Sequence, residues 1–455
     1  MGCGSPEVHL SQPPKREIIR HPKPIYIDML QNPTYQTPAL QINFNKCISC
    51  QNCVDLCEFS ILKTCDNSFP LVQETRNQKK QMRISLNTSD CISCGQCVIA
   101  CPTQAISINQ SILKLDKTKI NIAILSPAVL IAVQEKFGEK FIFSHLITFL
   151  KQHNFELFFD ASYGVDLVIK EEVNMVIAAK KAQKFIIGSQ CSGVCQLIEK
   201  QFPQYLTNLS TVKNQYNALS SYIKHVYSQK MQMDPDKFFI VHFTPCLVEK
   251  EFKFRKDISK DVDLVISTVE LLEFMDQNNF VNTKDINDQF TQNFNSISKF
   301  AKQFQVPGYY TELLARQIFS SYSESFDMSQ INISSLQKYD RFNQSIKLLS
   351  FTSGNFFFTF VIANGAKAVL DVFQMIKNGK LSPDFVECLI CNTGCCNGGG
   401  MPQKFSFIDI VHRSQQLMAN TKLVKTNEDK NPDIEEFYQS SDVQIIKQNY
   451  IPYSD

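Results

Sequence analysis

Two matching stretches of sequence, CISCQNCVDLC (47–57) and CISCGQCVIAC (91–101), decide the first part of the fold. Each stretch spaces its cysteines as C-x2-C-x2-C-x3-C, so that each contributes four thiols from one short segment. The first three thiols fit a tight loop around one metal centre, while the fourth lies at the start of a helix and reaches elsewhere. Two such runs in one chain predict two metal centres that share ligands.

This is the spacing by which bacterial-type ferredoxins hold two 4Fe–4S clusters, and there the fourth cysteine of each run binds the cluster of the other run. The second run ends in Cys101-Pro102, which matches that pattern, whereas the first ends in Cys57-Glu58. A structural zinc site is the alternative, and the spacing disfavours it. We expect one cluster on Cys47, Cys50, Cys53 and Cys101, and another on Cys91, Cys94, Cys97 and Cys57.

Composition narrows the class of protein. A chain of 455 residues is long enough for two or three domains, and a net charge of +2 gives no sign of a nucleic-acid or anionic-membrane partner. The 17 cysteines, several at ligand spacing, indicate thiolates kept in a reducing compartment. We therefore expect the cytoplasm rather than an organelle such as a hydrogenosome or mitochondrion.

Neither end of the sequence carries a clear membrane signal. No apolar run is long enough for a transmembrane helix. The start, MGCGSP (1–6), resembles an N-myristoylation signal, but Pro6 stands where serine or threonine is required. A plain N-terminus is therefore favoured over lipidation.

Composition and hydrophobic pattern divide the chain into segments. An extended, proline-bearing segment (1–39) precedes a ferredoxin domain (40–112), whose polar stretch 65–87 predicts an inserted hairpin or loop. From Lys119 on, short apolar runs alternate with helical patterns, which predicts parallel α/β units with ligands at the carboxyl ends of the strands. Residues 280–350 give no assignment, and exposed helices are expected after about residue 410. The predicted strands lie in 119–127, 155–160, 184–191, 238–246, 263–270 and 385–391.

Four further cysteines close these strand-end loops, namely Cys191, Cys246, Cys391 and Cys395. Four thiolates suit a third 4Fe–4S cluster, although buried structural thiols beside a glycine-rich turn are an open alternative. Glycine lets the backbone approach a cofactor closely, so the cofactor-binding candidates are Gly394, Gly398, Gly399 and Gly400. The remaining thiols nearby, including Cys195, Cys388 and Cys396, are expected to be small buried side chains.

Three motifs resemble those of the FeFe (iron-only) hydrogenase family, which includes the nuclear prelamin A recognition factor-like iron–sulfur proteins. The family's TSCCPGW, MPCxxKK and ExMACxGGCxxGGGQP correspond here to GSQCSGV (188–194), TPCLVEK (244–250) and ECLICNTGCCNGGGMP (387–402). The resemblance covers about residues 40–440. It implies an α/β hydrogenase large domain of two lobes with parallel sheets (119–410) and a helical small-subunit-like tail (411–455). The α+β bacterial-type ferredoxin domain with its two 4Fe–4S clusters precedes them.

The resemblance also implies a diiron subcluster bridged by Cys395, but the residues around it depart from the family. The proton-donating cysteine is Gln190, whose amide does not titrate in water. The family's lysine that binds a cyanide ligand is replaced here by Glu249, so the attraction between the side chain and this anionic ligand becomes a repulsion. Two methionines that surround the diiron site in the family are replaced here by Thr244 and Leu389. On the proton path Glu172 and Ser210 match the family, but the outer glutamate is Met175.

These departures define the functional expectation. We expect an iron–sulfur redox protein with three 4Fe–4S clusters, in which a diiron subcluster is doubtful and hydrogen turnover is impaired. An active ferredoxin hydrogenase is the first alternative. A cytosolic iron–sulfur assembly factor, or a non-catalytic component of a larger complex, is the second. The expected partner is accordingly a redox protein such as ferredoxin or an iron–sulfur assembly complex.

Overall fold

The structure is a computed structural model. It describes residues 34–59, 62–65, 83–86, 90–111, 113–280, 288–291, 297–322, 331–338, 345–403, 407–422, 432–440 and 443–448. The expected N-terminal lead-in lies outside these residues up to position 33, and so does part of the expected tail.

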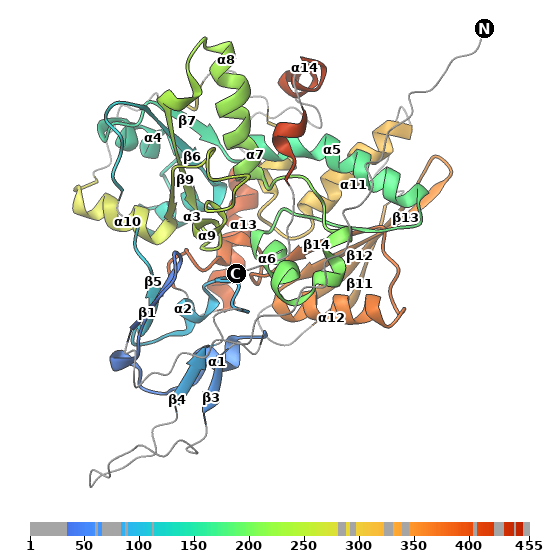
Figure 1. Cartoon of the computed structure of the whole chain (residues 1–455), viewed down its shortest axis with the longest axis horizontal. Coiled ribbons are helices and arrows are strands. Elements are labelled where there is room, and N and C mark those ends of the chain that lie inside the picture. Colours follow the sequence, from blue (N-terminus) through green and yellow to red (C-terminus); the bar gives the residue numbers. More distant parts are fainter. Residues whose placement is uncertain are drawn as a thin grey trace.

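A four-stranded parallel sheet forms one half of the molecule (Figure 1). Its strands are almost wholly buried, as expected where helices cover both faces of a parallel sheet. All four strands were predicted from the sequence, and their parallel pairing is confirmed. In spatial order they are β10 (Leu264–Ser267), β9 (Phe238–Thr244), β6 (Ile120–Leu125) and β7 (Leu157–Asp160).

A five-stranded mixed sheet forms the second half. The two strands predicted in 184–191 and 385–391 pair in parallel with each other, and the second also pairs in parallel with β13 (Phe356–Asn364). Strands β11 (Asn332–Lys338), β12 (Ser345–Ser353) and β13 form an antiparallel meander. The meander lies partly in residues 280–350, where no element was predicted. In spatial order the strands are β11 (Asn332–Lys338), β12 (Ser345–Ser353), β13 (Phe356–Asn364), β14 (Phe385–Leu389) and β8 (Ile186–Ile187).

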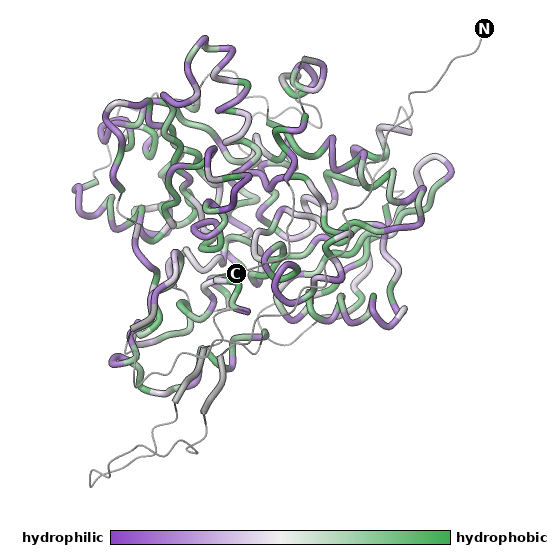
Figure 2. The backbone as a smooth tube through the Cα atoms, viewed as in Figure 1, coloured by the Kyte–Doolittle hydropathy of each residue, from purple (hydrophilic) through white to green (hydrophobic). Residues whose placement is uncertain are grey.

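One hydrophobic core joins the two sheets. It contains β-strand residues from both, such as Ile124 and Phe238 of the first and Phe360 and Phe385 of the second. Helices α5 (Ser162–Lys181), α7 (Gln215–Tyr222) and α11 (Tyr309–Tyr322) contribute many of its other residues. Figure 2 shows the apolar strands gathered inside and the polar residues concentrated on the outer helices and loops.

Most of the other α-helices lie in the chain between consecutive strands, whereas α13 and α14 follow the last strand (Figure 1). These other helices are α3 (Pro127–Phe137), α4 (Phe143–Gln152), α6 (Ser192–Gln201), α8 (Ser228–Lys230), α9 (Glu249–Phe252), α10 (Thr268–Gln277), α12 (Ala366–Lys377), α13 (Phe407–Lys422) and α14 (Pro432–Ser440). Between α7 and α8 the chain forms a π-helical turn, η3 (Ile223–Tyr227).

The N-terminal part is a small antiparallel sheet of β1 (Thr34–Gln36), β2 (Leu40–Asn43) and β5 (Ile106–Ile108), packed with the short helices α1 (Asn52–Leu56) and α2 (Gln96–Ala100). Strands β3 (Leu62–Cys65) and β4 (Arg83–Leu86) pair antiparallel between the two cysteine runs, which confirms an inserted hairpin. Residues 66–82 within it lie outside the described part.

The expectation of exposed helices after residue 410 is wrong in part. Helix α13 spans the predicted limit at 410/411 and buries Arg413 completely, because its guanidinium binds Glu135 and the backbone oxygens of Cys396 and Pro402. Helix α14 buries Phe437 against the core that joins the sheets. Both helices are therefore packed on one side and exposed on the other. The domain limits themselves stay predictions.

Candidate metal centres and their surroundings

Two cavities in the N-terminal part are each lined by four of the predicted ligands. Helices α1 and α2 pack against each other, so the last cysteine of each run reaches the loop of the other. Cys57 and Cys101 directly follow the ends of these helices, so the expectation that they start a helix is wrong. The first cavity is lined by Cys47, Cys50, Cys53 and Cys101 together with apolar side chains such as Ile42. The second is lined by Cys57, Cys91, Cys94 and Cys97. These are the two crossed sets that the spacing predicts.

The thiols within each set lie close enough to affect one another. Burial, together with the neighbouring Cys101, Cys47 and Cys50 thiols, raises the pKa of Cys53 to about 12. Burial likewise raises the pKa of Cys94 to about 12, with additional contributions from Cys57, Cys91 and Cys191. Thiols that are so costly to ionise in an apolar site need a positive partner to become thiolates.

A third group of four cysteines meets where the two large sheets face each other. Cys191 follows β8 and caps α6, Cys246 follows β9, and Cys391 and Cys395 follow β14. Burial raises the pKa of Cys395 well above its usual range, and the Cys191 and Cys246 thiols raise it further. Burial and the Cys191 thiol likewise raise the pKa of Cys391. The four cysteines that the sequence selected are thus neighbours in space.

Backbone N–H groups point at the sulfurs of this third group. Cys191 accepts from Ile390, Val194 and Gly193, and these contacts lower its pKa against the larger effect of burial. Cys391 accepts from Gly399, and Cys246 accepts from Glu249. Donors aimed at sulfur favour the thiolate form, which is the form that binds iron.

The glycine-rich turn at 398–400 makes close backbone contacts. A Cβ atom on Gly399 would lie 2.4 Å from the Cys94 oxygen and 2.6 Å from the Gly95 Cα atom. A Cβ atom on Gly398 would lie 2.4 Å from the Pro245 oxygen, and one on Gly394 would lie 2.1 Å from the Gln305 oxygen. These glycines therefore let protein backbone approach protein backbone, and their contact with a cofactor stays a prediction. The loop of the second set thereby packs directly on the third.

Glu249 is fully buried and enclosed by hydrogen-bond donors. The Asn214 Nδ2 atom donates to Oε1 at 2.9 Å, Asn217 Nδ2 donates to Oε2 at 3.4 Å, and the Ser192 hydroxyl also donates to Oε1. Burial raises the pKa of Glu249 to about 7 although all three donors lower it. The carboxyl group thus has its own polar cradle, built from α6, α7 and the loop before α7.

The residues of the predicted proton path lie in one row. Gln190 Nε2 stands 3.4 Å from Glu172 Oε2, and the Ser210 hydroxyl, which hydrogen-bonds Glu172, also contacts Met175 Sδ at 3.9 Å. Tyr310 donates to Glu172 as well. Burial raises the pKa of Glu172 to about 7, with a further contribution from the buried Glu387 carboxyl. The thioether of Met175 ends the row where the family has a carboxyl group.

A hydrogen-bonded group of polar side chains stands on the other side of Cys395. Gln305 accepts the Cys395 N–H at its backbone oxygen (3.0 Å), and its Nε2 donates to Ser126 Oγ at 2.7 Å and to the Tyr216 hydroxyl at 3.1 Å. Tyr216 also hydrogen-bonds Thr244. These side chains satisfy one another with short contacts.

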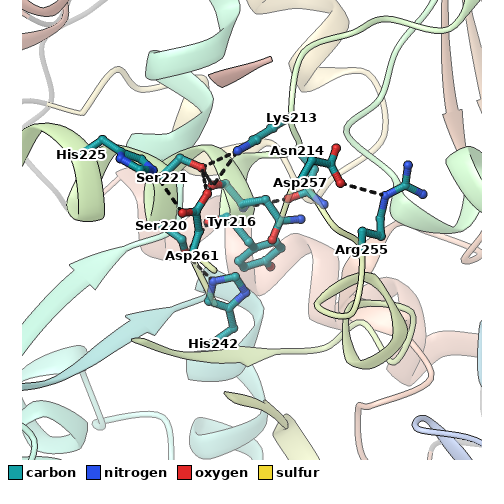
Figure 3. A network of polar contacts seen from close by, with 11 residues as sticks. Lys213, Asn214, Tyr216, Ser220, Ser221, His225, His242, Arg255, Asp257 and Asp261 are labelled. Carbon is teal, nitrogen blue, oxygen red and sulfur yellow. Dashed lines mark hydrogen bonds and ion pairs between the residues drawn. The ribbon is translucent and has the colours of Figure 1, made fainter. Parts of the chain in front are cut away.

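A further polar network extends from this region toward the surface (Figure 3). Asp261 accepts from Ser221 Oγ at 2.5 Å and pairs with buried Lys213 at 3.2 Å. The other Asp261 oxygen lies 3.3 Å from His225 Nε2, and the His225 side chain is 52 % exposed. The network anchors α7 and the π-helical turn to the segment after α9.

Sequence reasoning missed the residues that satisfy the substituted positions. Asn214 and Asn217 cradle Glu249, Tyr310 binds Glu172, and Gln305 supports Cys395. Asn214 and Asn217 lie three residues apart at the start of α7, and this spacing was the only local signal. Their role depends on long-range contacts that no motif encodes.

Among the residues that the structure describes, no three histidine, cysteine or carboxylate side chains stand close enough to share one metal ion. In a four-iron cluster each thiolate contacts a different iron atom, so the wider spacing is compatible with such a cluster. No helix among those residues is both long and apolar enough to cross a membrane.

Comparison with known proteins places these features in a family. The model of the iron-only hydrogenase large subunit, C-terminal domain, matches residues 119–399, and that of the 4Fe–4S binding domain matches residues 84–107. Iron hydrogenase 1 of Clostridium pasteurianum is 27% identical over 81% of this chain and 65% of its own length. The chain thus spans about two thirds of that relative.

Eukaryotic relatives and a solved structure are also similar to this chain. The nuclear prelamin A recognition factor of Xenopus laevis is 25% identical over 56% of this chain and 57% of its own length. Cytosolic iron–sulfur assembly component 3 of mouse is 23% identical over 65% and 64%. The FeFe-hydrogenase HydA1 of Chlamydomonas reinhardtii superposes with a TM-score of 0.62, at 19% identity, over 75% of this chain and 97% of its own. The chain therefore belongs to the FeFe (iron-only) hydrogenase family.

Proposed function

We propose that the chain is an iron–sulfur redox protein that holds three 4Fe–4S clusters and whose hydrogen turnover is impaired or absent. Each cluster, when bound, takes up and gives back an electron. The donor sets support this count, because each consists of four thiols and the third is also surrounded by backbone N–H donors. The proposed ligands are Cys47, Cys50, Cys53 and Cys101 for the first, Cys57, Cys91, Cys94 and Cys97 for the second, and Cys191, Cys246, Cys391 and Cys395 for the third.

The arrangement of the three sets supports a direction for electron transfer. Cys50 of the first set is exposed, so an external redox protein such as ferredoxin can reach that side. The second set exchanges its last cysteine with the first set. Cys94 of the second set lies close enough to the third set that Cys191 raises the pKa of Cys94, and Cys94 raises the pKa of Cys391. Electrons would therefore pass inward from the surface to the centre between the two sheets.

The surroundings of Cys395 do not fit a diiron subcluster. Glu249 stands where the family has a lysine beside an anionic ligand, and Ser192, Asn214 and Asn217 saturate its carboxyl group. The ionised form of this carboxyl group repels an anionic ligand, its neutral form does not attract one as a lysine would, and none of the three donors is a cation. The enclosed carboxyl group of Glu249 is the single observation that carries the proposal of impaired hydrogen chemistry.

The proton path supports the same conclusion. Gln190 contacts Glu172 but its amide does not titrate in water, and Met175 closes the outer end with a thioether. Removing a positioned proton donor alone typically costs on the order of 10²–10⁴ in rate. The path is thus interrupted at both ends while Glu172 and Ser210 between them are retained.

Two alternatives remain distinguishable from this proposal. An active hydrogenase requires the chain to load a diiron subcluster despite Glu249. An assembly role, as in the mouse relative, is favoured by the loss of the cysteine at position 190. The complete ferredoxin-type set of eight cysteines favours electron transfer instead. We further propose a cytoplasmic location, since twelve thiolate ligands require a reducing compartment.

The ligand assignment is tested by iron analysis of protein purified without oxygen. We expect about 12 iron atoms per chain, and about 8 after Cys391→Ser, on the four-iron stoichiometry of such clusters. The matched control is Cys388→Ser, because Cys388 is a buried neighbour in the same motif that we do not assign as a ligand. Iron near eight in the unaltered protein, unchanged by Cys391→Ser, would remove the third cluster.

A further inference from the structure

Gln96 belongs to the second cysteine run but reaches the third set. It lies between Cys94 and Cys97, as the first residue of α2. Its Nε2 atom stands 3.6 Å from Cys391 Sγ and 3.1 Å from the Asn397 backbone oxygen. One side chain therefore connects the loop around the second cavity to a proposed ligand of the third cluster.

The orientation of the Gln96 amide follows from its two partners. The nitrogen and oxygen of a glutamine amide look alike in shape, so their assignment rests on hydrogen bonding. A thiolate sulfur and a backbone oxygen are both acceptors, and only the NH2 end of the amide can satisfy both at once. Reversing the amide would put its oxygen against two electron-rich atoms. The N–H group therefore points at the sulfur.

The backbone holds this side chain in place. Gly95 caps α2 with a positive φ of 75°, and a Cβ atom there would lie 2.6 Å from Leu247 Cδ1 and 2.9 Å from the Gly399 Cα atom. Gly399 in turn leaves no room for a Cβ beside Cys94. The two loops are thus in backbone contact immediately before Gln96, and this packing fixes the start of α2 from which Gln96 reaches Cys391.

We propose that Gln96 is a positioning residue that raises the reduction potential of the third cluster through an N–H···S hydrogen bond to Cys391. The inference rests on the proposed assignment of Cys391 as a ligand. Reduction adds negative charge that is shared with the ligand sulfurs, and an N–H donor stabilises the reduced state more than the oxidised one. The low polarity of the buried site strengthens the effect. Gly399 N–H, the other donor to this sulfur, stays in place when Gln96 is changed.

The test is a redox titration followed by electron paramagnetic resonance on the full protein, with the third cluster's signal identified as the one that Cys391→Ser removes. In Gln96→Leu we expect the midpoint potential of this signal to become more negative. The matched control is Gln403→Leu, since Gln403 donates to the Val98 oxygen at 2.8 Å in the same interface without touching sulfur. The control should titrate like the unaltered protein.

Two outcomes would overturn the proposal. An unchanged midpoint in Gln96→Leu, with the cluster retained, would make Gln96 an interface contact only. A full iron content without any signal sensitive to Cys391→Ser would instead refute the ligand assignment, and the two failures are distinguishable.

A second measurement covers the case in which Gln96→Leu loses iron. Pulsed electron paramagnetic resonance of protein labelled with ¹⁵N in its glutamine side chains should detect nitrogen coupled to the third cluster. Gln96→Asn, whose shorter side chain withdraws the amide from the sulfur, should lose this coupling. Persistence of the coupling in Gln96→Asn would contradict the assignment.

Discussion

Replacing Glu172 by glutamine should change how the stability of the protein depends on pH. Glu172 is 1% exposed, its Oε2 atom accepts from Tyr310, and its Oε1 atom has no hydrogen-bond partner among the described residues. The Gln190 Oε1 atom is also without a partner there. An NH2 group at position 172 can therefore donate where the carboxylate cannot.

The magnitude follows from the pKa of Glu172. Burial raises this pKa from 4.5 to about 7, a shift of about 2.5 pKa units. Each pKa unit corresponds to about 1.36 kcal/mol, so the shift corresponds to about 3 kcal/mol of stability. Because the folded protein binds this proton more tightly than the unfolded chain, the stabilisation is fully present below pH 4.5. It is lost as the pH rises through about 7, when the buried carboxyl group must ionise.

The assay is anaerobic thermal unfolding of the iron-loaded protein at several pH values from about 5 to about 8.5. Relative to the unaltered protein, Glu172→Gln should gain about 2.5 kcal/mol between the two ends of this range, because a small part of the effect is already lost at about pH 5. The exposed Glu156→Gln serves as the control and should follow the unaltered protein. Parallel curves for Glu172→Gln and the unaltered protein would refute the reasoning, since they would mean that Glu172 does not bind its proton more tightly in the fold.

Three further changes probe the surrounding site. Asn214→Ala removes the 2.9 Å donor to Glu249 and should lower the free energy of unfolding by about 1–3 kcal/mol in chemical denaturation; no loss would mean that the cradle is not needed. Gly399→Ala places a Cβ atom 2.4 Å from the Cys94 oxygen, so we expect loss of iron and proteolytic release of the N-terminal part, and normal iron content would contradict this. Removal of iron by a chelator should make residues 40–112 sensitive to protease, because this small segment depends on its clusters for stability; continued resistance would show an independent core.

The sequence allowed the prediction of most of the parallel strands and of the two crossed cysteine sets, whose signals are local. The parallel strands were recognised because buried runs such as 238–246 are continuously apolar and end at a polar tip or a cysteine. Cysteine spacing gave the crossed sets that line the two cavities. Strand β11 and most of β12 were not predicted because they lie in the polar region 280–350, where pairing partners decide the structure. Strand β13 lies beyond this region and was missed although its run FFFTFVIAN (356–364) is largely apolar.

The chemistry of the site was less predictable than its ligands. Substitution at positions 190 and 249 could be read from the motifs, but its consequence could not. Glu249 is satisfied by Asn214 and Asn217, and Gln190 faces Glu172 because Gly188 leaves space beside its amide. Such compensation arises between segments far apart in the chain, and a single sequence carries no signal for it.

Infrared spectroscopy tests the central claim most directly. A diiron subcluster of this family carries carbon monoxide and cyanide ligands, whose stretching bands are separate from those of protein. The native protein, purified without oxygen and also after incubation with a preformed diiron cofactor, should show no such bands while retaining its iron–sulfur clusters. Strong carbon monoxide and cyanide bands, accompanied by hydrogen evolution from reduced methyl viologen, would contradict the account and make the chain an active hydrogenase.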